Sequence, residues 1–408
     1  MAHPQTQKFF FQVDGLDNNF GLREAKRYKL KKTQKPRSEW TEPSSELIEE
    51  LGEINTGDPK VFSKFLTWGL ADLGDRRVAV ILWNHGTGII DFVPDNGSVK
   101  SVFSKALNGA FFTQPMKSFF RSLLSTSSNS IKSIATDVSS GGDALETLEL
   151  KEAIEYALSA SDVVDKIDLL VFDACFMASL ELMYELHQRC AFIVASSAVM
   201  PSRGLPYDRI LEDLAKNENI FPEEFGRLIV ENYGKEYRTR SWFVREPITL
   251  SCVSLAEIEE VVAKLEKLIT YIIDFYKEDK IKKFICLGLI KEAWKVTVEK
   301  FGDRNFIDLF SWMSQIKAKV LDQPSHFKPG LDADIEQLLD LIISKAIKSN
   351  VSFVRRDYSK PPPPIDSRGC TIFVPVSTIG AMAMEKYRLL AFSRNGVPHW
   401  PEFLDDFV

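Results

Sequence analysis

The chain has 408 residues, of which 45% are hydrophobic and 26% are charged, and its formal net charge at pH 7 is −6. This composition is ordinary for a globular protein, and the length allows one large α/β domain with an appended part or two to three smaller domains. The acidic balance provides no basic footprint of the kind that nucleic-acid binding requires, so nucleic acid is not an expected partner.

The cysteines are scattered and odd in number, which fits neither a disulfide framework nor the spacing of metal ligands. We therefore expect mostly reduced thiols and no metal site or cofactor. No apolar run is long enough to span a membrane, and residues 1–15 lack the pattern of a signal peptide. These absences predict a cytoplasmic protein without a membrane partner, although a secreted protein whose signal was removed would give the same sequence. The oligomeric state is left open.

The first part of the chain predicts a strand, a charged segment and a helix. Residues 8–13 are typical of a strand, and the basic stretch 21–40 is typical of a solvated hairpin or loop. An acidic stretch follows, with the apolar residues of 47–51 on a short helix. Asp58 and Pro59 are typical of the N-cap and first position of the next helix.

His85 follows a predicted apolar strand and lies inside a glycine-rich turn. Residues 78–83 are an apolar run of strand length, which Asn84-His85-Gly86-Thr87-Gly88 interrupts. Glycines let the backbone approach a ligand closely, so His85 is a candidate catalytic residue. The competing interpretation is a structural histidine.

Residues 91–133 are predicted to be an insertion. The 90 residues from His85 to Cys175 (175 − 85) exceed what one βαβ crossover needs. A short strand that ends at Asp137 and a helix over 145–158 follow the insertion.

Cys175 lies where a strand pattern changes into a helix pattern. Residues 167–172 are a nearly continuous apolar run, and 176–186 carry apolar residues at helical spacing. This predicts Cys175 at the N-terminus of a helix, where unpaired N–H groups and the helix dipole favour a thiolate nucleophile. The alternative is a buried structural cysteine.

Strands and helices alternate from residue 78 to residue 200, which predicts a doubly wound α/β sandwich. Ligands bind such a sheet at the carboxyl ends of its strands. His85 and Cys175 would therefore lie on the same rim, together with the loop over 200–207.

The texture of the sequence changes after about residue 210. Helix patterns dominate there, apart from a strand at 247–253 and a late strand near 370–376. We therefore divide the chain into a core over 1–250 and a mainly helical C-terminal region over 251–408.

The two candidate residues stand in motifs that resemble those of the clostripain family of cysteine peptidases. An Asn-His-Gly motif and an Asp-Ala-Cys motif each follow an apolar strand, in that order along the chain. The pair of motifs is specific, whereas a lone His-Gly would not be. Similar segments extend the resemblance over most of residues 51–376; they are 51–88, 137–150, 167–186, 195–211, 305–310 and 367–376.

The resemblance implies a caspase-like three-layer α/β/α sandwich with a mostly parallel sheet, as in caspases, legumains and gingipains. It implies an endopeptidase that hydrolyses bonds of a peptide or protein substrate through a thioester on Cys175. His85 would be the general base and later the general acid. Backbone N–H groups of Gly86 and Cys175 would form the oxyanion hole.

The residues expected to select the substrate depart from the family pattern. Members generally cleave after Arg or Lys, through acidic residues in the pocket (S1) that holds the residue before the scissile bond (P1). Asp173 matches one of these acids, and its position two residues before Cys175 directs it to the same rim. Where a second acid is common, the loop before Gly204 has Arg203, which could pair with Asp173, repel a cationic P1 side chain or face solvent. We assign Asp173, Ser196 and Arg203 to S1, with a helix N-cap as the alternative role of Asp173.

Three further family traits are expectations for this chain. Members often mature by cleavage between the His and Cys motifs. Calcium dependence occurs in some members, although this chain has no EF-hand-like loop. Members usually carry an extra strand and helix before the first strand found here, so an exposed sheet edge is expected. The basic residues of the insertion that could be cut are Lys100, Lys105, Lys117, Arg121 and Lys132.

Other functions fit the same motifs. Arg203 and the missing N-terminal unit favour a catalytically silent caspase-like binding protein, and Arg203 also favours an active peptidase with a non-basic P1 preference. A thiol amidase or acyltransferase that acts on small substrates is a third alternative.

Overall fold

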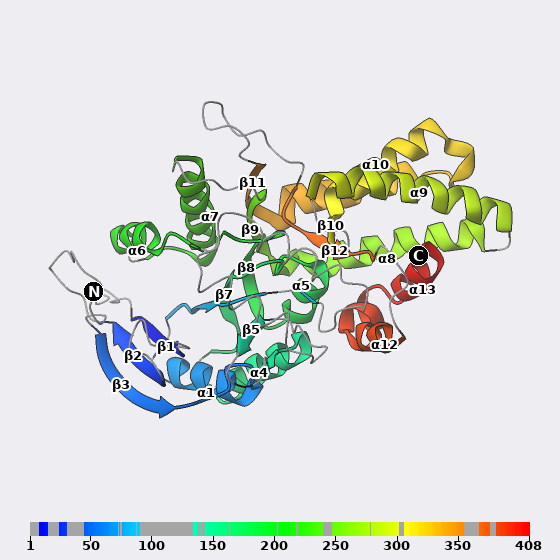
Figure 1. Ribbon diagram of the computed structural model, residues 1–408. Coiled ribbons are helices and arrows are strands. Elements are labelled where there is room, and N and C mark those ends of the chain that lie inside the picture. Colours follow the sequence, from blue (N-terminus) through cyan, green and yellow to red (C-terminus); the bar gives the residue numbers. More distant parts are fainter. Residues whose placement is uncertain are drawn as a thin grey trace, which may run out of the picture.

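The computed structural model (Figure 1) has a mixed β-sheet between two layers of helices, followed by further helices. It describes residues 8–14, 24–30, 45–71, 73, 76–86, 88–89, 134–137, 140, 143–162, 164–201, 203–217, 219–239, 247–277, 279–301, 306–354, 367–375 and 381–408. The predicted insertion at 91–133, with its candidate cleavage sites, lies outside these residues.

The apolar runs of the sequence form the central sheet, whose strand order is β11-β9-β8-β7-β4. β4 (Ala79–Trp83), β7 (Ile167–Asp173) and β8 (Cys190–Ala195) are parallel, and each corresponds to a predicted strand. β9 (Pro247–Ser254) pairs antiparallel with β8, and β11 (Ile347–Val354) pairs antiparallel with β9. The sheet therefore has a parallel core with two antiparallel strands on one side.

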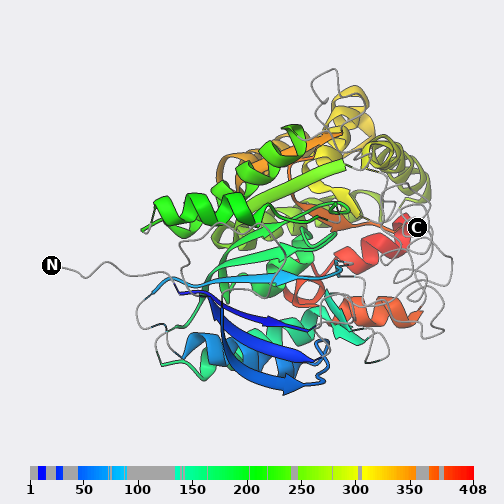
Figure 2. The ribbon, with the colours of Figure 1, turned by 60° about the vertical axis from the view of Figure 1, so that its left-hand side comes forward.

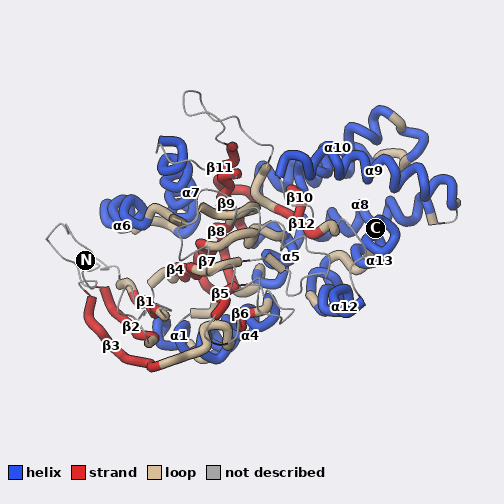
Figure 3. The backbone as a smooth tube through the Cα atoms, viewed as in Figure 1, coloured by secondary structure: helices blue, strands red, loops and turns tan. Residues whose placement is uncertain are grey.

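Helices cover both faces of this sheet (Figure 3). Leu169 and Val171 of β7 pack with apolar residues of α6 (Tyr207–Lys216) and α7 (Pro222–Thr239). Leu170 and Phe172, which point the other way, pack in the core with a second helical layer. The helices of that layer include α1 (Pro59–Leu70), α4 (Thr147–Ser159), α5 (Leu180–Leu186) and α8 (Ile258–Tyr276). The predicted three-layer sandwich is confirmed.

A separate antiparallel sheet of β1 (Phe10–Val13), β2 (Ala25–Leu30) and β3 (Ser45–Gly52) packs on α1 (Figure 2). The short helix predicted at 47–51 is wrong, because these residues belong to β3. The acidic residues of β3 face the basic residues of β2, with Lys26 Nζ 3.3 Å from Glu50 Oε1 and Arg27 Nη1 2.9 Å from Glu49 Oε2. Opposite charges across two strands stabilise a sheet, which local sequence patterns do not reveal.

The region after residue 254 is mainly helical, but it also supplies strands. Its sequence pattern does not predict β11, which completes the central sheet. β12 (Thr371–Phe373) corresponds to the predicted late strand, but it pairs with β10 (Phe306–Asp308) in a separate two-stranded sheet. The remaining helices are α9 (Lys280–Phe301), α10 (Leu309–Asp322), α11 (Leu331–Leu341), α12 (Ala381–Leu389) and α13 (Trp400–Phe407).

Candidate active site

The structure brings the loops of His85 and Cys175 into direct contact. β4 and β7 end at the same level, because Trp83 pairs with Asp173, and each candidate residue lies two positions beyond this pair. The backbone of Gly86 lies against the Cys175 loop: a Cβ at Gly86 would be 2.5 Å from the carbonyl oxygen of Cys175. The sequence prediction that the two residues share one rim of the sheet is thus supported by the backbone geometry.

The His85 loop is fixed on both sides of the histidine. The backbone N–H of His85 donates to Asn84 Oδ1 over 2.6 Å. Gly86 forms an antiparallel bridge with Ile134 of β5 (Ile134–Asp137), which pairs with β6 (Asp143–Leu145). The segment after the insertion therefore positions the histidine loop.

Cys175 lies in a turn rather than at the start of a helix, so its predicted placement is wrong. α5 begins at Leu180, and its N-cap is Ser179, whose hydroxyl accepts the N–H of Leu182 over 3.3 Å. Asp173 is therefore not a helix N-cap either. Phe176 has a φ of +60°, a left-handed conformation that ends any helical continuation from Cys175.

Backbone hydrogen bonds from the Cys175 turn to the loop after β8 hold the turn. The N–H of Phe176 donates to the carbonyl of Ala198 over 3.1 Å, and the N–H of Ala178 donates to that of Ser196 over 3.1 Å. In the other direction, the N–H of Met200 donates to Cys175 Sγ over 3.2 Å. The thiol thus keeps a fixed position between the two loops, and Cys175 as a residue is partly exposed.

The surroundings of Cys175 and His85 favour the neutral form of each side chain. Burial raises the pKa of Cys175 to about 11, the N–H of Met200 opposes this shift, and the charge of Asp173 adds to it. Burial lowers the pKa of His85 to about 4. At neutral pH the thiol is therefore protonated and the imidazole is neutral, and both pKa shifts oppose transfer of the proton from sulfur to a ring nitrogen. The helix-dipole effect predicted from the sequence does not act here, because no helix begins at Cys175.

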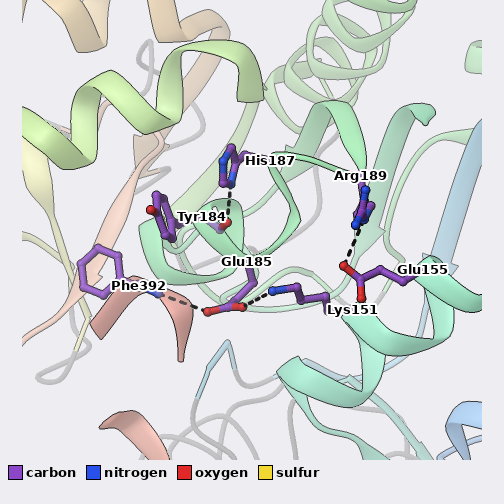
Figure 4. Close-up of polar contacts among 7 residues, drawn as sticks. All are labelled: Lys151, Glu155, Tyr184, Glu185, His187, Arg189 and Phe392. Atoms are coloured by element: carbon purple, nitrogen blue, oxygen red, sulfur yellow. Dashed lines mark hydrogen bonds and ion pairs between the residues drawn. The ribbon is translucent and has the colours of Figure 1, made fainter. Parts of the chain in front are cut away.

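α5, which follows the Cys175 turn, is anchored to elements from both halves of the chain (Figure 4). The buried carboxylate of Glu185 accepts hydrogen bonds from Lys151 of α4 over 3.1 Å and from the N–H of Phe392 over 3.2 Å. At the end of this helix, His187 Nδ1 donates to the carbonyl of Tyr184 over 2.5 Å, and the two rings stack. His187 therefore has a structural role.

The C-terminal region also contacts both candidate catalytic loops through Phe306 of β10. Its ring stacks on Phe176 with 6.3 Å between centroids, and a Cβ at Gly88 would be 3.0 Å from Phe306 Cζ. Next to it, the N–H of Thr371 donates to the carbonyl of Ala178 over 2.8 Å. The strand pair β10–β12 thus supports the turn that carries the cysteine.

Phe306→Ala is expected to lower kcat by about tenfold or more with little change in KM, because both loops lose a shared contact. Removing a buried phenylalanine typically costs about 3–5 kcal/mol of stability, so Phe407→Ala, which removes an equally buried ring far from the loops, is the matched control. Steady-state kinetics and thermal unfolding of both variants separate the effects. Equal losses of stability with equal kcat values would show that Phe306 does not position the loops.

Asp173 is buried and serves as an acceptor for the turn over 204–207. Its Oδ2 accepts the N–H of Leu205 over 3.1 Å and the O–H of Tyr207 over 2.8 Å. Gly204 has a φ of +63°, and a Cβ there would be within 2.7 Å of both carboxylate oxygens. Burial raises the pKa of Asp173 to about 6, although both hydrogen bonds oppose the shift. The sequence gives no direct signal for these contacts with Leu205 and Tyr207.

The other two residues assigned to S1 make contacts away from the Asp173 carboxylate. Arg203 is half-exposed, and its Nε is 3.8 Å from Glu236 Oε1 in α7; Arg209 Nε is 3.4 Å from the other oxygen of that buried carboxylate. Ser196 is fully buried, and its hydroxyl lies 2.8 Å from that of Thr249 and donates to the carbonyl of Ala198 over 3.0 Å. The Ser196 hydroxyl thus stabilises the loop that binds the Cys175 turn.

No group of three or more His, Cys, Asp or Glu side chains among the described residues could hold a metal ion. Within the same residues, no helix has the length and apolar character needed to cross a membrane.

Comparisons with known proteins agree with this architecture. The model of the clostripain family (peptidase family C11) matches residues 122–353, more than half of the chain, which includes Cys175 but not His85. The chain is 23% identical over 262 residues to clostripain of Hathewaya histolytica. This match covers 58% of the chain but only 43% of that protein, so the chain matches less than half the length of this relative.

Two crystal structures have a similar fold. A secreted C11 cysteine protease from Bacteroides thetaiotaomicron, in complex with an irreversible peptide inhibitor, aligns with a TM-score of 0.54 at 15% identity over 91% of this chain and 85% of its own. An inactive zymogen C11 protease from Parabacteroides distasonis aligns with a TM-score of 0.53 at 15% identity over 91% and 84%. The fold and site thus define a cysteine-peptidase-like α/β protein. The chain belongs to the clostripain family.

Proposed function

We propose that the chain is a cysteine endopeptidase in which Cys175 is the nucleophile and His85 is the general base. The contact between their loops carries the proposal, because the Gly86 backbone lies on the carbonyl of Cys175 at the matched ends of β4 and β7. A thiol and an imidazole on one rim are the groups that thiol-based acyl transfer needs.

The reaction begins from a protonated thiol and a neutral imidazole. Neutral His85 takes the proton of the Cys175 thiol as sulfur attacks the peptide carbonyl. The N–H groups of Gly86 and Cys175 donate to the oxyanion that forms. The imidazolium then protonates the leaving amine, which gives a thioester, and water activated by His85 hydrolyses it.

An irreversible peptide inhibitor tests the assignment directly. Incubation with a peptidyl-arginine chloromethylketone, followed by peptide mapping, is expected to find the adduct on Cys175 and on none of the four other cysteines. Labelling of another cysteine, or of all five at the rate of a free peptide thiol, would contradict the proposal and favour a silent binding protein.

We assign P1 selection for Arg or Lys to the carboxylate of Asp173, through Oδ1, since Oδ2 already accepts from Leu205 and Tyr207. Its carboxylate lies at the end of β7, two residues before the nucleophile, and Arg203 has Glu236 as an ion-pair partner. Arg203 therefore has a counter-charge on α7, which lowers its repulsion of a cationic P1 side chain. A P1 preference for non-basic residues remains the alternative.

Asp173→Asn is expected to lower kcat/KM for Arg substrates by about tenfold or more relative to Leu substrates, since a charge-assisted hydrogen bond contributes about 1.5–3 kcal/mol. In the wild type the carboxylate loses its charge as pH falls through its raised pKa of about 6, so the Arg/Leu ratio of kcat/KM should fall over that range. In the variant the ratio should not depend on pH. An unchanged ratio in the variant would assign P1 selection to other groups.

The cellular location stays a prediction. The similarity to a secreted protease of Bacteroides thetaiotaomicron favours the secreted alternative over the cytoplasmic one.

A further inference from the structure

One face of β4 is exposed and apolar, and it ends next to the loop that carries His85. Ala79, Ile81 and Trp83 alternate along this strand and are exposed, with Ile81 at 37% and Trp83 at 71%. The residues between them, Val80 and Leu82, turn inward to the core on the other face.

The register between β4 and β7 shows that the helices on this face of the sheet cover β7 but not β4. Ala79, Ile81 and Trp83 pair with Leu169, Val171 and Asp173 of β7, so each pair of side chains lies on the same face of the sheet. On β7 those partners are at most 3% exposed beneath α6, α7 and the turn over 204–207, whereas on β4 the equivalent positions are open.

Trp83 is the member of this face that lies at the site. It is paired with Asp173, the acidic residue assigned to the S1 pocket, and it is two residues before His85. A large indole that is 71% exposed leaves apolar area in water that a bound apolar group would cover. The exposed face of β4 therefore ends beside His85 and Asp173.

We propose that Trp83 forms the wall of a substrate subsite that binds an apolar side chain flanking P1. The inference rests on the proposed peptidase function. It goes beyond P1 selection, because it predicts a second specificity-determining residue on the strand that carries His85. The ligand is a branched aliphatic or aromatic side chain, since these groups bury the most apolar area against an indole face.

The test uses internally quenched peptides with a fixed P1 residue and either Leu or Gly at each flanking position in turn. At one position the wild type is expected to have a Leu/Gly ratio of kcat/KM of about tenfold, from the apolar area that leucine buries. Trp83→Ala should bring this ratio close to one, and Trp83→Phe should restore most of it. Tyr156→Ala, which removes an aromatic side chain of 64% exposure on α4, is the matched control and should leave the ratio unchanged.

The outcomes separate this inference from the proposed function. Turnover in which Trp83→Ala leaves the Leu/Gly ratio unchanged at every flanking position would overturn the subsite and leave the peptidase intact. Absence of turnover of any peptide by the wild type would overturn the proposed function itself. A concentration-dependent dimer that Trp83→Ala dissociates would assign this face to a second copy of the chain and would likewise overturn the subsite.

Discussion

Cys175→Ala is expected to reduce peptide hydrolysis to the background rate while the fold is kept. Cys175 as a residue is only partly buried, so the substitution should cost little stability, whereas the thioester cannot form without its sulfur. The hydrogen bond from the N–H of Met200 is lost, and that N–H can bind water instead. Turnover of fluorogenic peptides and the thermal unfolding midpoint are the two measurements.

The matched control is Cys190→Ala, which makes the same chemical change at a fully buried thiol at the start of β8. It should lose stability, since it leaves a small cavity, and keep its kcat. If Cys175→Ala retains the activity of the wild type, or if Cys190→Ala also abolishes it without unfolding, Cys175 is not the nucleophile.

Gly86→Ala is the second large effect that we expect, with a loss of about 10²–10³ in kcat. The new Cβ would be 2.5 Å from the carbonyl oxygen of Cys175 and 3.0 Å from both Ala174 Cβ and Met177 Sδ. The carbonyl oxygen of Cys175 belongs to the backbone and cannot rotate away as a flexible side chain would. The new Cβ must therefore push the His85 and Cys175 loops apart. Loss of one oxyanion donor alone typically costs about 10²–10³ in rate.

Gly69→Ala is the control for this substitution, because a Cβ at that position in α1 meets no atom within 4 Å. Alanine is favoured over glycine in a helix by about 1 kcal/mol, so this variant should be slightly more stable and fully active. Peptide kinetics and the alkylation rate of Cys175 with iodoacetamide report on the site in both variants. Wild-type kinetics in Gly86→Ala would contradict the close contact between the loops.

Some structural results were predictable because they depend on neighbours in the sequence. The Asp58 N-cap and Pro59 at the start of α1 are local chemistry, and both occur as predicted. The apolar runs at 78–83 and 167–172 became parallel strands. β7 is buried on both faces, which leaves a continuous apolar pattern, whereas β4 is buried on one face only. β3 and β11 were missed because their stability comes from cross-strand partners distant in sequence.

The candidate active site likewise has features that depend on local sequence and features that depend on tertiary contacts. The sequence by itself determined that His85 and Cys175 follow two apolar strands, because strand ends and glycine turns are marked by local composition. Only the tertiary structure decided that Cys175 lies in a turn with a raised pKa, because burial depends on elements such as the loop that carries Met200. It likewise decided that Trp83 is open while its partner Asp173 is covered, since α6 and α7 extend over β7 but not over β4. The burial of a strand depends on the layers that pack on it, and the sequence of the strand does not predict which helices will cover each of its faces.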